Sequence, residues 1–557
     1  MYIRQTSRKN KDGTTVSYLQ LAHNEWDPEA GYARARILYN FGRADQVDRE
    51  ALERLVKSVC RFLSPETALQ TEAMLKGQEG IRIDRTRKMG GSWVLDHLWG
   101  ELGIKKVFQK LLKARSFRTP VERLIFAMVA NRALSPRSKL GIEEWVDKDT
   151  VISELESVSS QQLYRAMDFL LEASESIQWE VYRSVSNLLN LEVDLLYFDT
   201  TSTYFEIETP DEAEEPFRTY GYSRDRRPDR PQAVIGLAVT RDGIPVRCWV
   251  WPGNTNDMSV IEEVKRDLSG WKLGRVITVL DRGFASDANM RTLQRAGGHY
   301  IVGEPLSSGK PGVEAALSAR GRYHKVRDNL EVKEIVVGDG EARQRYVLVR
   351  NPDQAKRDLA HRKEVVSKLE EELKNLSYLP SGQHTKAVCT LRSHPAYGRF
   401  LRQTKGGKLK VDRGKVKAQE RLDGKYLLRT SDDTLSPEDV ALGYKQLVEI
   451  EDAFRTLKQT LDIRPVYHRL EDRIRSHVLI CWLALLMIRV IENRTGHTWR
   501  RVRAVLERIY LADIRARQGK ITQRTEIQPD QKAIFKAIGV PEPPRVDSIH
   551  TPRNRQT

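Results

Sequence analysis

Two aspartates follow runs of apolar residues that read as buried strands. Asp199 follows such a run in "LLYFDTTSTYFE", and Asp281 follows another in "VITVLDRGF", where Gly283 allows a tight exit. A carboxylate that is removed from water is costly unless it is paired or binds a metal ion. A single aspartate of this kind is most simply explained as the cap of the next loop. Two of them together favour a shared chemical site where the strands end.

A third carboxylate lies on a predicted helix that spans about residues 437–461. At about 100° per residue, Glu451 falls at the border of the apolar stripe of this helix. The other two acids of "VEIED", Glu449 and Asp452, fall further round towards water. We therefore expect only Glu451 to face the protein interior. The alternative is an ion pair at the helix edge between Glu451 and Arg455, which would stabilise the helix only slightly.

Three carboxylates on two strands and one helix are the hard oxygen ligands that a pair of Mg²⁺ or Mn²⁺ ions requires. Two ions roughly 4 Å apart can activate a water or a 3′-hydroxyl and stabilise the leaving oxygen. Asp199, Asp281 and Glu451 are therefore the candidate catalytic and metal-binding residues for phosphodiester hydrolysis or transfer. The 11 histidines are scattered, and no G-x-x-x-x-G-K-[ST] motif is present. No nucleotide cofactor is expected.

The composition favours a large protein that binds a polyanion. A chain of 557 residues with 40% hydrophobic and 30% charged residues can bury a core and form several domains. Its net charge of +17 predicts attraction to nucleic acid. Ribosomal or membrane-surface binding is the alternative, although such basic proteins are usually much shorter. The four cysteines form no C-x-x-C pair, which argues against structural zinc and against a disulfide framework.

Two segments bear on cellular location. The N-terminal stretch "MYIRQTSRKNKDG" has charges where a signal peptide would have its apolar region, so we expect a cytoplasmic protein. The strongly apolar run from Val478 to Ile488 is shorter than the roughly 20 residues that span a bilayer. It is predicted to be a buried helix, and no membrane contact is expected.

The elements that must position the carboxylates change character along the chain. The N-terminal part contains a predicted hairpin with a turn at Asp12-Gly13, followed by an amphipathic helix. A helical, basic region follows, for which DNA binding and an ordinary helical bundle both remain open. Strands in β-β-β-α-β order then predict a mixed sheet with helices on its faces.

These changes divide the chain into six expected regions. The expected fold class is a multidomain α/β architecture. The interlude before the glutamate helix is too long for a loop, and we expect an inserted β-rich subdomain there. The C-terminal region is basic and ends in a tail that is expected to be disordered. In order, the regions are the α+β module, the helical region, the first part of the core, the insertion, the second part of the core and the basic C-terminal region: 1–88, 89–190, 191–305, 306–431, 432–493 and 494–557.

The stretch "YKQLVEIEDAFRTLK" resembles the Y-x2-R-x3-E-x6-K signature of one group of bacterial insertion-sequence DDE transposases. It supplies Tyr444, Glu451 and Lys458 at the signature spacings. "FDTTS" and "LDRGF" are similar to the first and second aspartate motifs of that group, which gives Asp199 and Asp281 as its aspartates. The long interval before the glutamate also fits the β-rich insertion of that group. The resemblance covers roughly residues 190 to 490.

The resemblance implies an RNase H-like catalytic core and Mg²⁺-dependent nicking of DNA at transposon ends, followed by joining of the 3′-hydroxyl to target DNA. It also implies that the protein forms a homodimer on DNA. Its implied location is the cytoplasm, in association with the nucleoid when it is bound to DNA. Tyr444 and Lys458 would contact DNA phosphates, with Arg455 and Arg282 as further candidates. A metal-dependent nuclease and a non-catalytic DNA-binding protein derived from a transposase are the alternatives. For the four arginines of the loop "SRDRRPDR", DNA binding and simple solvation remain equally open.

Two departures from the group pattern are present. Leu447 stands at the arginine position of the signature and belongs to the apolar stripe, so Arg455 is the candidate substitute. Residues 306–431 contain no tryptophan, whereas some relatives use one there to stack on a flipped base. Four other aromatic residues of the insertion are candidates for stacking: Tyr323, Tyr346, Tyr397 and Phe400.

Overall fold

The computed structural model divides the chain into two compact units, which are described separately below. The first comprises Met1–Arg87, Ile509–Glu526 and Pro543–Thr557, and the second comprises Lys88–Arg508 and Ile527–Glu542. The residues that the structure describes are 1–11, 14–60, 62, 82–113, 115–189, 194–271, 276–340, 343–376, 378, 380–464, 466–516 and 519–550.

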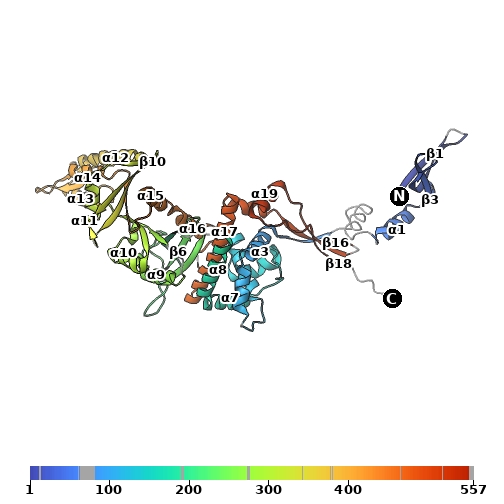
Figure 1. The fold of residues 1–557 in the computed structure, drawn as a ribbon, viewed down its shortest axis with the longest axis horizontal. Helices are drawn as coiled ribbons and strands as arrows, with labels where there is room; N and C mark the ends of the chain where they lie inside the picture. Colours follow the sequence, from blue (N-terminus) through green and yellow to red (C-terminus); the bar gives the residue numbers. More distant parts are fainter. Residues whose placement is uncertain are drawn as a thin grey trace. The chain divides into compact units, whose positions relative to one another are not determined.

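The described residues of the first unit form two sheets and a helix (Figure 1). The N-terminal sheet has the order β1-β2-β3, and helix α1 follows it. The second sheet, of order β18-β17-β16-β4, combines one strand from the N-terminal part with three from the C-terminal part. The turn predicted at Asp12-Gly13 and the tail at residues 551–557 lie outside the described residues. The bounds are β1 Tyr2–Lys9, β2 Thr15–Asp27, β3 Tyr32–Arg43, α1 Arg49–Cys60, β4 Arg82–Lys88, β16 Tyr510–Ala516, β17 Gly519–Arg524 and β18 Val546–His550.

The second unit is organised around a nine-stranded sheet with the order β10-β11-β12-β15-β9-β8-β5-β6-β7. Strands β5, β6 and β7 are antiparallel neighbours, whereas β5, β8 and β9 run parallel. The large mixed sheet expected from the sequence is therefore confirmed. The bounds are β5 Leu195–Tyr204, β6 Gln232–Thr240, β7 Pro245–Pro252, β8 Ile277–Leu280, β9 His299–Glu304, β10 His324–Arg327, β11 Leu330–Val337, β12 Gln344–Arg350 and β15 Lys425–Thr430.

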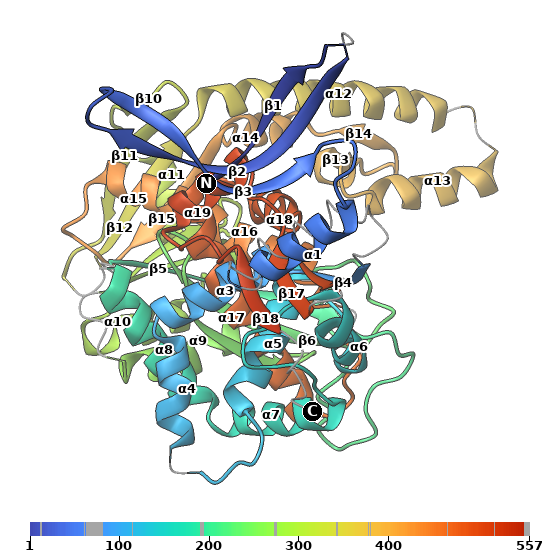
Figure 2. The same ribbon diagram turned by 90° about the vertical axis from the view of Figure 1, so that its right-hand side faces the viewer.

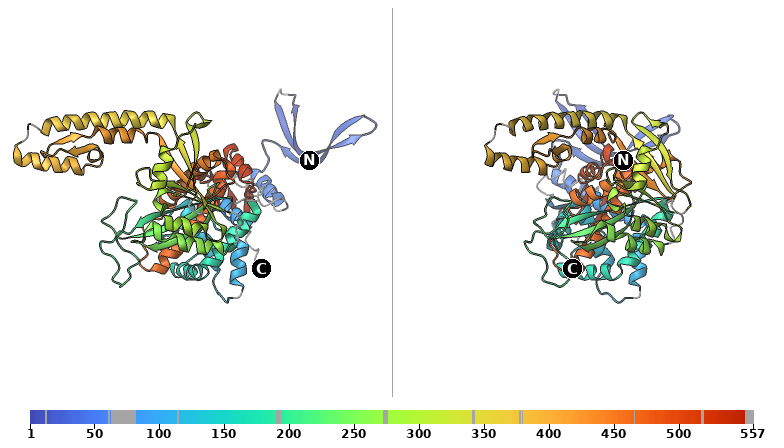
Figure 3. Two further views of the ribbon diagram at one scale, coloured as in Figure 1. Left: turned by 60° about the vertical axis from the view of Figure 1, so that its left-hand side comes forward. Right: turned by 90° about the vertical axis from the view of Figure 1, so that its left-hand side faces the viewer.

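The segment expected to form an insertion contributes to the same sheet. Strand β15 pairs antiparallel with β9 on one side and with β12 on the other, so β10–β12 extend the sheet. The rest of the segment has its own hydrophobic cluster, which includes Leu369 and Phe400. Two of its helices, α12 and α13, lie side by side (Figure 3). The bounds are α11 Pro311–Ser318, α12 Pro352–Leu376, α13 Ser381–Ser393, β13 Leu401–Gln403, β14 Leu409–Val411 and α14 Arg413–Glu420.

The alternating side chains of β5 face two different layers, as expected for a strand covered on both faces. Leu196 and Phe198 join a hydrophobic cluster with residues of α9 (Ile261–Ser269) and α10 (Asp287–Gln294). Helix α9 was not expected from the sequence. The opposite face carries Tyr197 and Asp199, and helices α15 (Pro437–Lys445), α16 (Val448–Gln459) and α17 (Glu471–Thr495) contact the sheet there.

Helix α17 is the central helix of a helical layer that also includes α5 and α7 (Figure 2). It is long and apolar enough to cross a membrane by length and composition, but 94% of its most apolar window is buried inside the protein. The apolar run at Val478–Ile488 thus belongs to a buried helix, as predicted. The other helices of this layer have the bounds α3 Gly90–Glu101, α4 Ile104–Leu112, α5 Val121–Leu134, α6 Lys139–Glu144, η2 Trp145–Asp149, α7 Ser160–Glu172, α8 Ser174–Leu189, α18 Trp499–Leu506 and α19 Pro529–Ile538.

The predicted glutamate helix begins where expected, but it is two helices rather than one. Ser436 caps its start, because its hydroxyl accepts a hydrogen bond from the N–H of Asp439. At Gln446 and Leu447 the N–H groups bond to carbonyls three residues back, which is the tighter 3₁₀ pattern. The hydroxyl of Tyr197 on β5 also donates a 2.8 Å hydrogen bond to Oε1 of Gln446. The break between α15 and α16 is therefore held against the sheet.

Candidate active site

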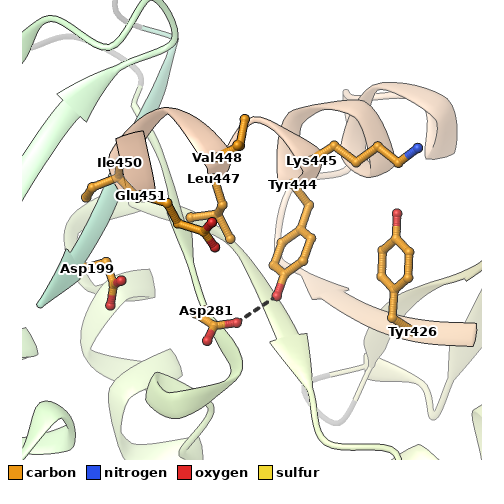
Figure 4. A pocket seen from close by; sticks show the side chains of 9 residues that line it. All are labelled: Asp199, Asp281, Tyr426, Tyr444, Lys445, Leu447, Val448, Ile450 and Glu451. Atoms are coloured by element: carbon orange, nitrogen blue, oxygen red, sulfur yellow. Dashed lines mark hydrogen bonds between the residues drawn. The ribbon is translucent and has the colours of Figure 1, made fainter. Parts of the chain in front are cut away.

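The three predicted carboxylates line one cavity of about 350 Å³ in the second unit. Figure 4 shows the carboxyl groups of Asp199, Asp281 and Glu451 facing the same space. They come from β5, from the residue after β8 and from α16. The remaining residues of the wall are Tyr426, Tyr444, Lys445, Leu447, Val448 and Ile450.

Strand register brings the two aspartates together. Strands β5 and β8 are parallel, and Phe198 is the register partner of Leu280. Asp199 and Asp281 are the next residues along the two strands, so they project from neighbouring positions. Asp281 directly follows β8, as predicted. Asp199 is not at a strand end, because β5 continues to Tyr204. The sequence prediction was wrong there, since the hydroxyl residues after Asp199 also pair with β6.

The half-buried carboxyl of Asp199 is in an environment that disfavours its negative charge. Burial raises its pKa to about 7, and the negative charges of Asp281 and Asp257 act in the same direction. The N–H of Thr200, which donates a 2.7 Å hydrogen bond to Oδ1 of Asp199, and the charge of Arg224 oppose this increase. A cation placed between these carboxylates would relieve the repulsion.

Tyr444 faces the second aspartate. Its hydroxyl donates a 3.0 Å hydrogen bond to Oδ1 of Asp281 (Figure 4). Tyr426 of β15 stacks on the Tyr444 ring, with centroids 5.9 Å apart. Tyr426 was missed in the sequence, and its position in the strand "GKYLLRT" was the available signal. Gly303 of β9 makes room for this arrangement, because a Cβ atom there would lie 3.0 Å from Cζ of Tyr444 and closer still to the hydroxyl.

A fourth aspartate supports the strand beside Asp199. The Thr200 hydroxyl donates a 2.5 Å hydrogen bond to Oδ1 of Asp257, and Arg224 donates to Oδ2 of the same carboxylate. Arg224 also lies 2.7 Å from the Thr200 hydroxyl oxygen. Asp257 begins the short helix η3 (Asp257–Ser259) and was not singled out in the sequence. Arg224 is one of the loop arginines, and it is ion-paired rather than simply solvated.

The other predicted DNA-binding residues lie outside the cavity wall. Lys458 donates a 2.8 Å hydrogen bond to Asp225, and burial lowers its pKa. Arg455 is exposed and forms a 2.7 Å ion pair with Asp452. Arg282 is exposed and follows Asp281 in the short helix η4 (Arg282–Phe284).

Two further expectations about the glutamate helix were wrong. Glu451 lines the cavity but is the exposed one of the three acids, whereas Glu449 and Asp452 are half-buried, and burial raises the pKa of Glu449. Leu447 is not part of a buried stripe but is a half-buried residue of the cavity wall. Glu449 is covered by its surroundings, because Arg489 donates a 3.2 Å hydrogen bond to its backbone carbonyl and Gly243 lies against its carboxyl group. The prediction for Leu447 assumed one continuous helix of 100° per residue. The turn at Gln446–Leu447 rotates the two halves relative to that ideal.

Two of the proposed base-stacking residues are buried. Tyr346 and Phe400 are each only 1% exposed, because they belong to hydrophobic clusters of the segment between β9 and β15. They cannot present a ring face to a base without unfolding their surroundings. Tyr323 and Tyr397 are half-buried, and the Tyr397 ring stacks on His394 with centroids 4.2 Å apart.

The cavity wall supplies the donor atoms that a hard divalent cation prefers. Carboxylate oxygens are what Mg²⁺ and Mn²⁺ prefer. Within the described part of the chain, no three His, Cys, Asp or Glu side chains are grouped closely enough to hold a metal ion. The cavity is therefore lined by the right ligands in an open arrangement.

A mixed sheet with aspartates on neighbouring strands and a glutamate on a facing helix defines a candidate DDE enzyme. The chain belongs to the transposase DDE domain family, whose model matches residues 202–487, more than half of its length. Asp281 and Glu451 lie within the match, and Asp199 lies three residues before its start. Residues 3–71 match the N-terminal domain of the IS1634 family of transposases. The protein is thus an insertion-sequence DDE transposase, an enzyme that cleaves and transfers DNA.

Comparison with curated proteins found no match. Among solved structures, the chain is similar to a piggyBac transposase in a synaptic complex with hairpin DNA, at 11% sequence identity. That similarity covers 81% of this chain and 78% of the other, with a TM-score of 0.33.

Proposed function

We propose that this transposase nicks DNA at the ends of its element and joins the freed 3′-hydroxyl to target DNA, with Asp199, Asp281 and Glu451 as its catalytic and metal-binding residues. The observation that carries this assignment is the parallel register of β5 and β8. It sets the two aspartates side by side, and α16 brings Glu451 to the same cavity.

Support for an RNase H-like core comes from the strand order β7-β6-β5-β8-β9 within the larger sheet. Its first three strands are antiparallel, and β5, β8 and β9 are parallel. In this assignment, residues 191–305 and 432–493 form the catalytic core. Residues 89–190 bind the transposon end, and residues 306–431 are the insertion.

Two Mg²⁺ or Mn²⁺ ions held by the three carboxylates would activate the attacking hydroxyl or water and stabilise the leaving oxygen. The side chains of the protein hold and orient these groups. Asp199 and Asp281 contribute oxygens from the sheet, and Glu451 contributes them from the opposite wall. Tyr444 orients Asp281 through its hydrogen bond. Lys458, Arg455 and Arg282 contact DNA phosphates, which a protein of net charge +17 attracts.

We further infer a homodimer on DNA, because two transposon ends must be joined in one event. The protein would act in the cytoplasm, associated with the nucleoid while it is bound to DNA.

The test is a cleavage and joining assay with the purified full chain, Mg²⁺ and a duplex carrying the terminal sequence of the element. Nicked ends and joined products are expected. Asp199→Asn, Asp281→Asn and Glu451→Gln should each reduce both products by about a hundredfold or more, because each removes a metal ligand. Binding of the duplex without divalent ions should be retained in these variants.

Glu449→Gln and Asp452→Asn are matched controls, because both acids lie on α16 but not in the cavity wall. They should keep most of the activity. Strong residual cleavage in a cavity variant would remove that residue from the active site. Nicks without joined products from the wild-type protein would indicate a metal-dependent nuclease instead.

A further inference from the structure

Asp225 lies between two cationic side chains of the segment that follows the catalytic glutamate. Nζ of Lys458 on α16 donates a 2.8 Å hydrogen bond to Oδ1 of Asp225, and Nη1 of Arg464 lies 2.5 Å from the same oxygen. The Asp225 side chain is only 6% exposed, whereas Lys458 is 14% and Arg464 is 27% exposed. The loop after the first aspartate strand thus reaches the glutamate helix through one carboxylate.

The Asp225 carboxylate satisfies neither its own hydrogen bonds nor the charge around it. Both cations contact Oδ1, while the buried Oδ2 has no hydrogen-bond partner. Two positive charges face a single negative charge. A phosphate group has more oxygens to distribute over an ammonium and a guanidinium, and guanidinium groups bind it in a bidentate manner.

The surroundings also fit an occupant that can leave. Arg226, next to Asp225, has a left-handed backbone conformation with φ of 57°, which is unfavourable for a long side chain. Arg227 and Arg464 each lie over the ring of Tyr204, at 5.1 and 5.5 Å from its centroid. Cationic groups from the loop and from the segment after α16 therefore gather at the end of the strand that carries Asp199.

We propose that Lys458 and Arg464 form a binding site for a backbone phosphate of DNA, which Asp225 occupies in the DNA-free protein and leaves when DNA binds. The inference rests on the proposed function, because it assumes that Lys458 contacts DNA. It adds Arg464, from the stretch "IRPVYHR", as a phosphate ligand and Asp225 as the competing group. DNA binding then includes an internal exchange of a carboxylate for a phosphate.

Asp225→Asn tests this exchange. Equilibrium binding of the full chain to a duplex with the terminal sequence is measured in EDTA, across a salt series. Asp225→Asn should bind about tenfold more tightly than the wild-type protein, because two desolvated cations lose their internal partner and gain one in the DNA. Asp225→Glu keeps the competing charge and should bind within about twofold of wild type.

Asp229→Asn is the matched control. Asp229 is in the same loop and its replacement changes the net charge equally, but it pairs with Arg227 and Arg230 instead. It should change the affinity by less than about twofold. In the Asp225→Asn background, Lys458→Gln or Arg464→Gln should abolish the gain in DNA affinity, because a gain that arises at this site requires both cations.

Equal affinities of Asp225→Asn and Asp229→Asn would overturn the proposal, and so would a gain that persists with Arg464→Gln. If Asp225→Asn does not fold, wild-type affinity in both Lys458→Gln and Arg464→Gln would overturn it as well. These measurements involve no strand cleavage. A wild-type protein that shows the Asp225-dependent exchange but never nicks DNA would contradict only the catalytic assignment.

Discussion

The hydroxyl of Tyr444 donates a 3.0 Å hydrogen bond to Oδ1 of Asp281. The resemblance to DDE transposases implies a different role for Tyr444, contact with a DNA phosphate. In the structure, its partner is instead Asp281, one of the three proposed catalytic residues. A hydrogen bond to a metal-binding carboxylate fixes its orientation, and loss of such a bond commonly weakens metal binding.

Tyr444→Phe is expected to raise the Mg²⁺ concentration needed for half-maximal cleavage by about tenfold, because Asp281 loses its orienting donor. Binding to the terminal duplex in EDTA should stay within about twofold of wild type. The measurement is a Mg²⁺ titration of the initial nicking rate alongside a binding isotherm. A loss of DNA affinity with an unchanged Mg²⁺ requirement would favour the phosphate-contact role instead.

Gly303→Ala is expected to weaken the response to Mg²⁺ as well, because it displaces the Tyr444 ring. The added methyl would lie 3.0 Å from Cζ of Tyr444 and push the ring away from Asp281. The nicking rate at a fixed, subsaturating Mg²⁺ concentration should fall by about tenfold. Gly270→Ala is a suitable control, since its nearest atom would be at 3.8 Å. Wild-type rates in Gly303→Ala would show that Tyr444 can shift without consequence.

Lys139→Met is expected to stabilise the protein. Lys139 on α6 is 3% exposed, and its ammonium group has no hydrogen-bond partner. Burial lowers its pKa to about 7, and the charge of Arg132 acts in the same direction. The unfolded chain takes up the proton near pH 10.5, so this group costs most stability at or below pH 7 and progressively less as the pH rises. Lys139→Met should gain about 2 kcal/mol at pH 7.

Thermal melts at pH 7 and pH 9.5 check this expectation, and the gain should be smaller at the higher pH. Lys148→Met is the control, because Lys148 is 64% exposed and pairs with Glu144 on the surface. Its effect should stay below about 0.5 kcal/mol. A Lys139→Met protein that melts lower than wild type at pH 7 would show that the ammonium has a favourable role.

The sequence predicted the parts of the site that depend on local patterns. The apolar runs before Asp199 and Asp281 identify strands, and the spacing of Tyr444, Glu451 and Lys458 identifies the glutamate region. Strand alternation also explains why Asp199 faces the helices. These features require only neighbouring residues and the geometry of a strand or a helix.

The features that the sequence did not predict depend on contacts between distant residues. Asp225 and Lys458 are hydrogen-bond partners although they are 233 residues apart in the sequence. The residues around either one do not indicate that the two side chains meet. The break at Gln446–Leu447 involves a hydrogen bond from Tyr197, which a helical wheel does not include. Likewise, the sequence pattern of β10–β12 indicates a separate β-rich segment. The structure shows that β15 pairs with both β12 and β9 and so joins these strands to the main sheet.

The most direct test is anomalous X-ray diffraction from a crystal of the full chain bound to its terminal duplex and soaked in Mn²⁺. Convergence of Asp199, Asp281 and Glu451 on shared cations predicts two manganese peaks roughly 4 Å apart in the cavity, with oxygens of all three carboxylates at about 2.1 Å. Ordered manganese that contacts none of them, or a Glu451 carboxylate that stays in solvent beside a filled site, would contradict it.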